Sequence, residues 1–224
     1  MIKAIIFDLD GTLLNRERSV EIFIGQQYER FYTRMASVTK EKFVNRFIEL
    51  DNRGYVWKDQ VYKQLIDDFD IPSIPWEELL RDYLHHFKEC CIPFPNLIET
   101  LKELQKSQFL MGMITNGKGN FQMDNMKALN IDPYMDSILI SEWEGIKKPD
   151  PLIFRRAADR LQVFPEECVF IGDHPEKDVK AAQDAGMTAI WKKDAYWYEV
   201  KSDYSIEDLL EIHELVRHMN ACER

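Results

Sequence analysis

The sequence predicts an α/β protein: a Rossmann-like parallel sheet with helices on both faces, joined to a separate helical domain. The chain opens with a short continuous apolar run at residues 4–7, which is typical of a strand buried on both faces. The pattern then becomes helical, with apolar residues three and four positions apart. After Pro93, apolar runs alternate with amphipathic segments to the end of the chain. Such alternation is typical of parallel strands joined by right-handed helical crossovers.

Residues 16–89 carry the helical pattern and are expected to form a domain of about four helices, because turn residues separate successive apolar stripes. We therefore expect residues 1–15 and 90–224 to form the α/β core, and the helical insert to be a cap. Arg16 and Arg18 lie where the insert begins. They either contact an anion of the substrate or are exposed to solvent.

The remaining strands are each expected to follow an amphipathic helix. These strands cover residues 109–114, 137–140, 168–171 and 188–191. A closing helix is expected from Ile206 to Met219, because apolar residues recur there at helical spacing.

The composition excludes several classes of protein. With 224 residues, of which 45% are hydrophobic, the chain can bury a sizeable core and is not disordered. Its net charge of −10 argues against a binder of nucleic acid or of anionic membranes. No apolar run approaches the ~20 residues that cross a bilayer. The cysteines form no Cys-x-x-Cys pair, which suits inert thiols in a reducing cytoplasm; they are Cys90, Cys91, Cys168 and Cys222.

Polar side chains with acid, base or ligand chemistry follow the apolar strands. In an open parallel sheet, ligands bind at the carboxyl ends of the strands, near the point where the strand order reverses. We therefore expect the residues that follow these ends to lie close together. They are Asp8 and Asp10 after the first strand, Thr115 and Asn116 after the second, Lys147 and Lys148 after the third, and Asp173 with Asp178 after the fourth.

This set of residues predicts phosphoryl transfer at a magnesium site. Mg²⁺ prefers hard oxygen ligands, and the carboxylates of Asp8, Asp173 and Asp178 would supply them. The backbone carbonyl of Asp10 would complete the share that the protein provides. Four carboxylates, one Mg²⁺ and the Lys148 ammonium still sum to about −1, so a phosphate dianion would be repelled without the metal.

Further residues would hold the phosphoryl group. Lys148 would neutralise charge on the nucleophile and on the transferring group. The Thr115 hydroxyl and backbone N–H groups near Asn116 would bind phosphoryl oxygens at a helix N-terminus. Asp178 has an alternative role, because a carboxylate in the first turn of a helix complements the helix dipole.

Two aspartates separated by one residue suggest a division of labour. Gly11 permits a turn directly after them, so that both carboxylates can reach the same site. One could attack phosphorus to form an aspartyl-phosphate, while the other protonates the leaving oxygen and then deprotonates water. Asp8 is closer to the sheet and is the candidate nucleophile, and Asp10 is the candidate acid/base.

Together these residues resemble the four motifs of the haloacid-dehalogenase-like phosphatases, in the order of that family. The motifs are Asp8-Leu9-Asp10-Gly11-Thr12, Thr115-Asn116, Lys148-Pro149, and Gly172-Asp173 with Asp178. The resemblance implies that Asp8 is the nucleophile and Asp10 the acid/base. It also implies that Asp173 ligates Mg²⁺ beside Asp8, with Asp178 in support, and that the second and third motifs bind phosphate. The helical insert resembles the four-helix cap of the family.

The resemblance leaves more than one activity open. Haloacid dehalogenases of the family lack the second aspartate of the first motif and need no metal, so Asp10 and Asp173 argue against dehalogenation. A sugar-phosphate mutase shares the motifs and is an alternative. A regulatory module that binds a phosphorylated metabolite without turnover is another. The motifs favour a phosphatase that hydrolyses a small phosphomonoester.

The substrate is less closely indicated. The segment Thr115-Asn116-Gly117, followed by Gln122 and Lys127, is similar to members that act on nucleoside or sugar monophosphates, and phosphoglycolate is a further candidate. His174, between two of the predicted metal-site aspartates, either touches the substrate or has no role in the site.

Overall fold

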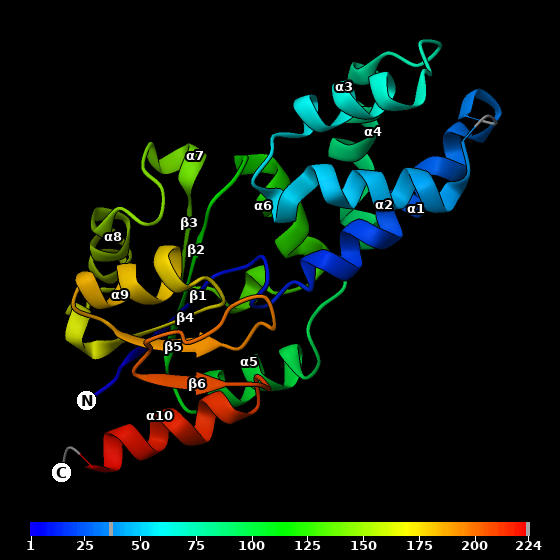
Figure 1. The fold of residues 1–224 in the computed structure, drawn as a ribbon. Helices are drawn as coiled ribbons and strands as arrows, with labels where there is room; N and C mark the ends of the chain where they lie inside the picture. The colour runs from blue at the N-terminus through cyan, green and yellow to red at the C-terminus, as the bar shows by residue number, and fades with distance from the viewer. Residues whose placement is uncertain (36–37, 223–224) are drawn as a thin grey trace. The chain divides into compact units, whose positions relative to one another are not determined.

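The structure, a computed structural model, describes residues 1–35 and 38–222, apart from the side chain of Cys222. It divides into two compact units: an α/β unit, Met1–Asn15 with Pro93–Arg224, and a helical unit, Arg16–Ile92 (Figure 1). Within the part of the chain that the structure describes, no helix has the length and apolar character that crossing a membrane requires.

The α/β unit contains a six-stranded sheet in which every pair of neighbouring strands is parallel. This arrangement confirms the predicted fold class. Across the sheet the order is β3-β2-β1-β4-β5-β6. The strands are β1 (Ala4–Phe7), β2 (Leu110–Thr115), β3 (Ser137–Ile140), β4 (Cys168–Gly172), β5 (Thr188–Lys192) and β6 (Tyr204–Ile206).

The strand order reverses between β1 and β4. The chain runs outward from β1 through β2 to β3, then returns to the other side of β1 to form β4, β5 and β6. Such a reversal opens a crevice at the carboxyl ends of the two central strands. The Asp8 N–H donates to the Ile171 carbonyl at 2.9 Å, which keeps the two strands paired up to their ends. The residues that follow β1 and β4 are thus delivered to one place.

Helices cover both faces of this sheet, with α8 and α9 on one face and α5 and α10 on the other (Figure 1). The helices of the unit are α5 (Leu97–Lys106), α6 (Gly119–Ala128), α7 (Ser141–Glu144), α8 (Pro151–Leu161), α9 (Ala181–Asp184) and α10 (Glu211–Cys222).

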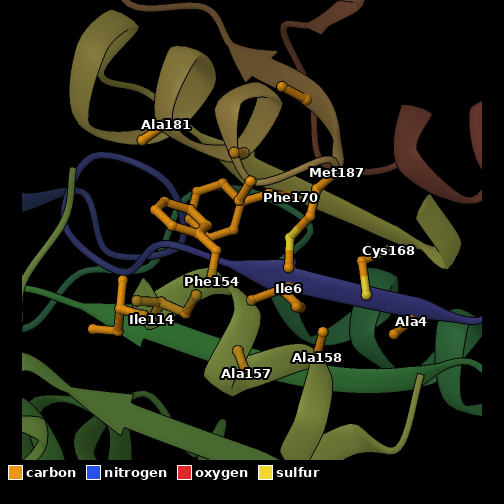
Figure 2. Close-up of a cluster of buried hydrophobic side chains, with 14 of the residues drawn as sticks. Ala4, Ile6, Ile114, Phe154, Ala157, Ala158, Cys168, Phe170, Ala181 and Met187 are labelled. Carbon is orange, nitrogen blue, oxygen red and sulfur yellow. The ribbon is translucent and has the colours of Figure 1, made fainter. Parts of the chain in front are cut away.

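The face covered by α8 and α9 has a buried apolar cluster, which includes Ile6 of β1, Phe170 of β4 and Phe154 of α8 (Figure 2). The rings of Phe154 and Phe170 meet edge to face, with centroids 4.9 Å apart. Alternate residues of a strand point to opposite faces, so a strand covered on both sides needs an unbroken apolar run, as in β1. Burying each aromatic ring stabilises the fold by roughly 1.5–3 kcal/mol.

The end of the chain differs from the prediction. Helical spacing predicts a closing helix from Ile206, but Ile206 is the last residue of strand β6, and α10 begins at Glu211. The predicted start is wrong because a strand of 3 residues is too short to show a period of its own. Its single buried residue, Ile206, also falls in step with the apolar positions of the helix that follows.

The helical unit has four α-helices among its described residues, which agrees with the predicted helical insert: α1 (Arg16–Met35), α2 (Lys40–Asp51), α3 (Lys58–Phe69) and α4 (Trp76–His86). Aromatic side chains form much of its core, and Phe23 meets Tyr83 edge to face with centroids 5.2 Å apart. Thr39 caps α2, where its hydroxyl accepts a hydrogen bond from the Lys42 N–H.

A buried set of ion pairs holds the start of α1 to the end of α2. Asp51, with a side chain 3% exposed, binds Arg16 at 2.9 Å and is also paired with Lys58. Burial raises the pKa of Asp51, but the two cations outweigh it and the pKa lies below its usual value. The Arg16 guanidinium therefore has an anion within its own unit. Arg18 instead pairs with Glu21 at the exposed surface.

We predict that Asp51→Asn lowers the free energy of unfolding at pH 7 by about 3 kcal/mol, because two largely buried cations lose their anion. The pKa of Asp51 is lower in the folded state than its unfolded value of 3.8. Asp51 therefore contributes fully to the free energy of unfolding above pH 3.8, and this contribution is lost as the pH falls through the folded-state pKa. Urea unfolding at several pH values measures it. Glu21→Gln, which breaks an exposed pair, is the control and should cost less than about 1 kcal/mol. Equal effects of the two variants would contradict the prediction.

Candidate active site

The polar residues predicted from the strand ends meet at the carboxyl edge of the sheet. Asp8 directly follows β1, Thr115 ends β2, and Asp173 directly follows β4. Lys148 lies in the loop between α7 and α8. All four side chains are buried, whereas the neighbouring Lys147 is exposed.

Lys148 is the central contact of the site. Its Nζ donates to Asp8 Oδ1 at 2.5 Å and to Asp178 Oδ1 at 2.6 Å. Burial disfavours the ammonium, but the charges of Asp178 and Asp8 outweigh burial and raise the pKa of Lys148 above its usual range. The lysine therefore remains a cation and holds together two carboxylates that come from distant parts of the chain.

Three buried carboxylates converge beside this lysine. One oxygen from each of Asp8, Asp173 and Asp178 lies within 4.8 Å of the others, an arrangement that could hold a metal ion. Burial raises the pKa of Asp8 to about 7 in spite of Lys148, and it raises the pKa of Asp173 well above its usual value. The negative charge of Asp178 adds to both effects. The carboxylates thus repel one another, with too little positive charge nearby to balance them.

A divalent cation fits this group of residues. Three ionised carboxylates against one ammonium leave two negative charges, which a dication would neutralise. The donor atoms are carboxylate oxygens, which suit Mg²⁺. The Asp10 side chain is not in this group, because its carboxylate is bound elsewhere, by Gln122. The metal-ligand role predicted for Asp10 concerns its backbone carbonyl and stays a prediction.

Two glycines allow the carboxylates to approach so closely. Gly11 has a φ of +89°, and a Cβ there would lie 2.5 Å from Asp173 Oδ2. A Cβ at Gly172 would lie 2.4 Å from Asp178 Cβ. Both positions therefore need a residue without a side chain, and Gly11 also needs one that adopts a left-handed conformation.

Asn116 holds the backbone of Lys148. Its Nδ2 donates to the Lys148 carbonyl and its Oδ1 accepts from the Lys148 N–H, both at 2.9 Å. The side chain thereby satisfies both polar groups of one peptide residue, as a neighbouring strand would. The side chain of Asn116 thus positions Lys148. The phosphate binding predicted for Asn116 concerns backbone N–H groups and stays a prediction. The nearby Gly117 N–H donates to Ser141 Oγ at 2.9 Å.

Gln122 belongs to the site in a way that sequence reasoning missed. Its Nε2 donates to Asp10 Oδ2 and to Thr115 Oγ1, both at 2.7 Å. From the sequence, Gln122 is noted only as a feature shared with certain family members, with no contact assigned. The usable signal is its place in the first turn of the helix that follows the Thr115-Asn116 motif, since that turn faces the strand end.

His174 and Asp178 fix each other at the start of the π-helix η5 (Pro175–Lys180). The His174 N–H donates to Asp178 Oδ2 at 3.1 Å. The imidazole Nδ1 accepts from the N–H groups of Glu176 and Lys177, at 3.1 and 3.2 Å, and so caps the helix. Asp178 thus lies in a first helical turn, as one of its predicted roles requires, and it also contacts Lys148. Its predicted role at the metal site stays a prediction.

The cysteines take no part in these contacts among the residues that the structure describes. Cys90, Cys91 and Cys168 form no disulfide bond in the part of the chain that the structure describes, and the side chain of Cys222 lies outside it. Burial raises the pKa of Cys168 to about 12, so its thiol stays protonated and unreactive.

The chain is similar to proteins of a known family over most of its length. A model of the haloacid dehalogenase-like hydrolase family matches residues 5–192. A glyceraldehyde 3-phosphate phosphatase of Pyrococcus furiosus is 27% identical, over 100% of this chain and 96% of the relative. The match therefore includes the helical unit and every predicted site residue.

Two solved structures resemble the chain over nearly its whole length. A HAD phosphatase from Thermococcus onnurineus has a TM-score of 0.69 and 27% identity, and the match covers 96% of this chain and 98% of that chain. A 2-haloacid dehalogenase from Pseudomonas syringae pv. Tomato DC3000 has a TM-score of 0.67 and 26% identity, covering 98% and 100%. Since this fold serves both chemistries, the site residues must distinguish them.

We predict that Gly172→Ala weakens the binding of a divalent cation by about 10- to 100-fold, the usual cost of disturbing the groups that support a metal site. The added methyl group would overlap Asp178 and displace its carboxylate from Lys148. Isothermal titration calorimetry with Mg²⁺ measures the affinity.

Gly25→Ala is the matched control, because its new Cβ would meet the flexible end of the Lys40 side chain, with Cε at 3.3 Å and Nζ at 3.7 Å. This variant should bind Mg²⁺ like the wild type. A folded Gly172→Ala protein with unchanged affinity would show that Asp178 does not support the cation.

Proposed function

The chain belongs to the haloacid dehalogenase-like hydrolase family and is a hydrolase of phosphomonoesters, and from this premise we propose that it acts through an aspartyl-phosphate with Mg²⁺ as cofactor. The observation that carries the proposal is the contact of one buried lysine, Lys148, with both Asp8 and Asp178. With Asp173, these residues provide a nucleophile, a cation and ligands for a metal at the point where the strand order reverses.

In the first step, a carboxylate oxygen of Asp8 forms a bond to phosphorus while the bond to the leaving oxygen breaks. Asp10 gives its proton to that oxygen, which departs as an alcohol. In the second step, Asp10 takes a proton from water, whose oxygen attacks phosphorus and releases the Asp8 carboxylate. The net reaction consumes one water and yields an alcohol and inorganic phosphate.

The cation would be held by Asp8, Asp173 and Asp178, together with the backbone carbonyl of Asp10. When bound, Mg²⁺ supplies positive charge that offsets the carboxylates and the phosphoryl oxygens. Asp8 must be ionised to attack, yet burial raises its pKa to about 7. Lys148 favours the ionised form of Asp8 through its hydrogen bond.

The phosphoryl group would be bound by Thr115 and Lys148. The Thr115 hydroxyl accepts a hydrogen bond from Gln122, so its own proton is available to a phosphoryl oxygen. Because the Gly117 N–H already donates to Ser141, the proposal assigns phosphate binding to the Thr115 hydroxyl rather than to that N–H.

We place the substrate among small phosphorylated metabolites, with short sugar phosphates first. Support comes from the relative named a glyceraldehyde 3-phosphate phosphatase, which aligns with the whole chain. Asp10 favours a phosphoryl substrate over a haloacid, because only a leaving alkoxide needs a proton donor. The helical unit, residues 16–92, would act as the cap that selects the substrate.

We predict that Asp8→Asn lowers kcat/KM for phosphate release by about 10⁴-fold or more, because the amide cannot form the covalent intermediate. A panel of triose phosphates, sugar phosphates, nucleoside monophosphates and phosphoglycolate identifies the substrate for the assay. Borohydride reduction during turnover, followed by mass spectrometry of the peptide containing residue 8, tests for the acyl phosphate. Asp67→Asn removes an exposed carboxylate of α3 and should leave activity unchanged. Near-normal turnover by Asp8→Asn would refute covalent catalysis.

Removal of divalent cations should abolish phosphate release, and Mg²⁺ should restore it. Mg²⁺ should also raise the thermal midpoint of unfolding, since a ligand that binds only the folded state at 100 times its Kd stabilises it by about 2.7 kcal/mol. Chelation with EDTA, readdition of Mg²⁺ and calorimetry measure both effects. Full activity in EDTA would overturn the assignment of the cofactor.

A further inference from the structure

One buried side-chain amide contacts both the candidate acid/base and the candidate phosphate-binding hydroxyl. Gln122, in the first turn of α6, is 2% exposed. Its Nε2 lies 2.7 Å from Asp10 Oδ2, 2.7 Å from Thr115 Oγ1 and 3.2 Å from the carbonyl of Asn116. An amide nitrogen carries two protons, so the two short contacts take one proton each. Gln122 therefore ties the candidate acid/base to the candidate phosphate-binding hydroxyl.

The orientation of this amide is determined by its surroundings. Gln122 Oε1 accepts a hydrogen bond from Asn125 Nδ2 at 3.2 Å. With Asp10 ionised, the opposite orientation would place an amide oxygen 2.7 Å from a carboxylate oxygen of Asp10, with no proton between them. The nitrogen must therefore face Asp10 and Thr115.

This orientation limits what each partner can do. Thr115 Oγ1 accepts from Gln122, and Nε2 has no lone pair to accept in return, so the hydroxyl proton must point to another acceptor. Asp10 Oδ2 accepts a hydrogen bond from the amide, which leaves Oδ1 as the oxygen that would exchange a proton with the leaving group. Both consequences suit a site that binds a phosphoryl oxygen and protonates a leaving group.

We propose that Gln122 is a positioning residue, which aligns Asp10 for proton transfer and directs the Thr115 hydroxyl to the phosphoryl group. This inference rests on the proposed function, because it needs Asp10 to act as acid and base. The N-terminus of α6 is itself anchored: the Gly119 N–H donates to Glu142 Oε2 at 2.7 Å. The amide is thus carried by a helix end that is fixed at the same edge of the sheet.

The test compares substrates that differ in their need for a proton. An alkyl phosphate has a poor leaving group that must be protonated, whereas 4-nitrophenyl phosphate releases a stabilised anion. Gln122→Met keeps the length of the side chain and removes both donors. We expect it to lower kcat/KM for the alkyl phosphate by about 10²-fold, the lower range of general acid catalysis, and for 4-nitrophenyl phosphate by less than about tenfold. kcat/KM is the relevant quantity because it reports the step in which the leaving group departs.

Gln27→Met is the matched control, since Gln27 is also a buried amide that donates to a carboxylate, Asp82, and to a backbone carbonyl. It lies in the helical unit and should leave the ratio of the two kcat/KM values unchanged. If Gln122→Met fails to fold, Gln122→Glu serves in its place, because a carboxylate of the same shape cannot donate to Asp10. Equal losses for both substrates, or none, would overturn the proposal.

Asp10→Asn separates this inference from the function on which it rests. Wild type without phosphatase activity, or Asp10→Asn with normal activity, would refute the proposed function and the inference together. With both as expected, the further loss caused by Gln122→Met should be smaller in the Asp10→Asn background than in wild type. If the double variant loses the product of the two single-variant factors in kcat/KM, Gln122 does not act through Asp10.

Discussion

Three buried carboxylates share the carboxyl edge of the sheet with one ammonium, and this imbalance of charge governs the α/β unit. Buried anions are tolerated where they are paired or hydrogen-bonded, and Lys148 pairs with Asp8 and Asp178 but leaves an excess of negative charge. Burial raises the pKa values of Asp8 and Asp173, and the negative charge of Asp178 raises them further. Because of this excess negative charge, binding a cation would stabilise the site. The same excess would repel an anionic ligand that binds without a cation.

The fold meets this constraint through its connectivity. Because β1 and β4 are neighbours, Asp8 and Asp173 emerge side by side although the whole helical unit lies between them in sequence. The reversal of strand order beside β1 leaves the space into which both carboxylates extend. Gly11 and Gly172 remove the atoms that would otherwise occupy it. The order of the strands brings the carboxylates to one place, and the absence of a Cβ at the two glycines lets them lie close together.

The sequence was sufficient to predict the parallel sheet, the helical insert and the convergence of the polar strand ends, because each depends on a local pattern. Continuous apolar runs mark the central strands, and polar residues at their ends mark the site. The edge strand β6 could not be predicted, since three residues show no period. The position of Gln122 after the Thr115-Asn116 motif was a usable signal, but the individual hydrogen-bond partners of Asn116 and Gln122 could not be predicted. A side-chain amide has no preferred partner in sequence, and both contacts depend on where loops meet after folding.

The described contacts of the candidate catalytic residues lie within the α/β unit. Each residue that touches Lys148, Asp10 or Thr115 in the contacts described comes from residues 1–15 or 93–224. The helical unit has an aromatic core and a buried ion-pair network of its own, centred on Asp51. Its surface can therefore change without disturbing the balance of charge that the chemistry requires. Under the proposed function, this division leaves the choice of substrate to the insert, while the carboxylates, lysine and threonine of the α/β unit stay the same.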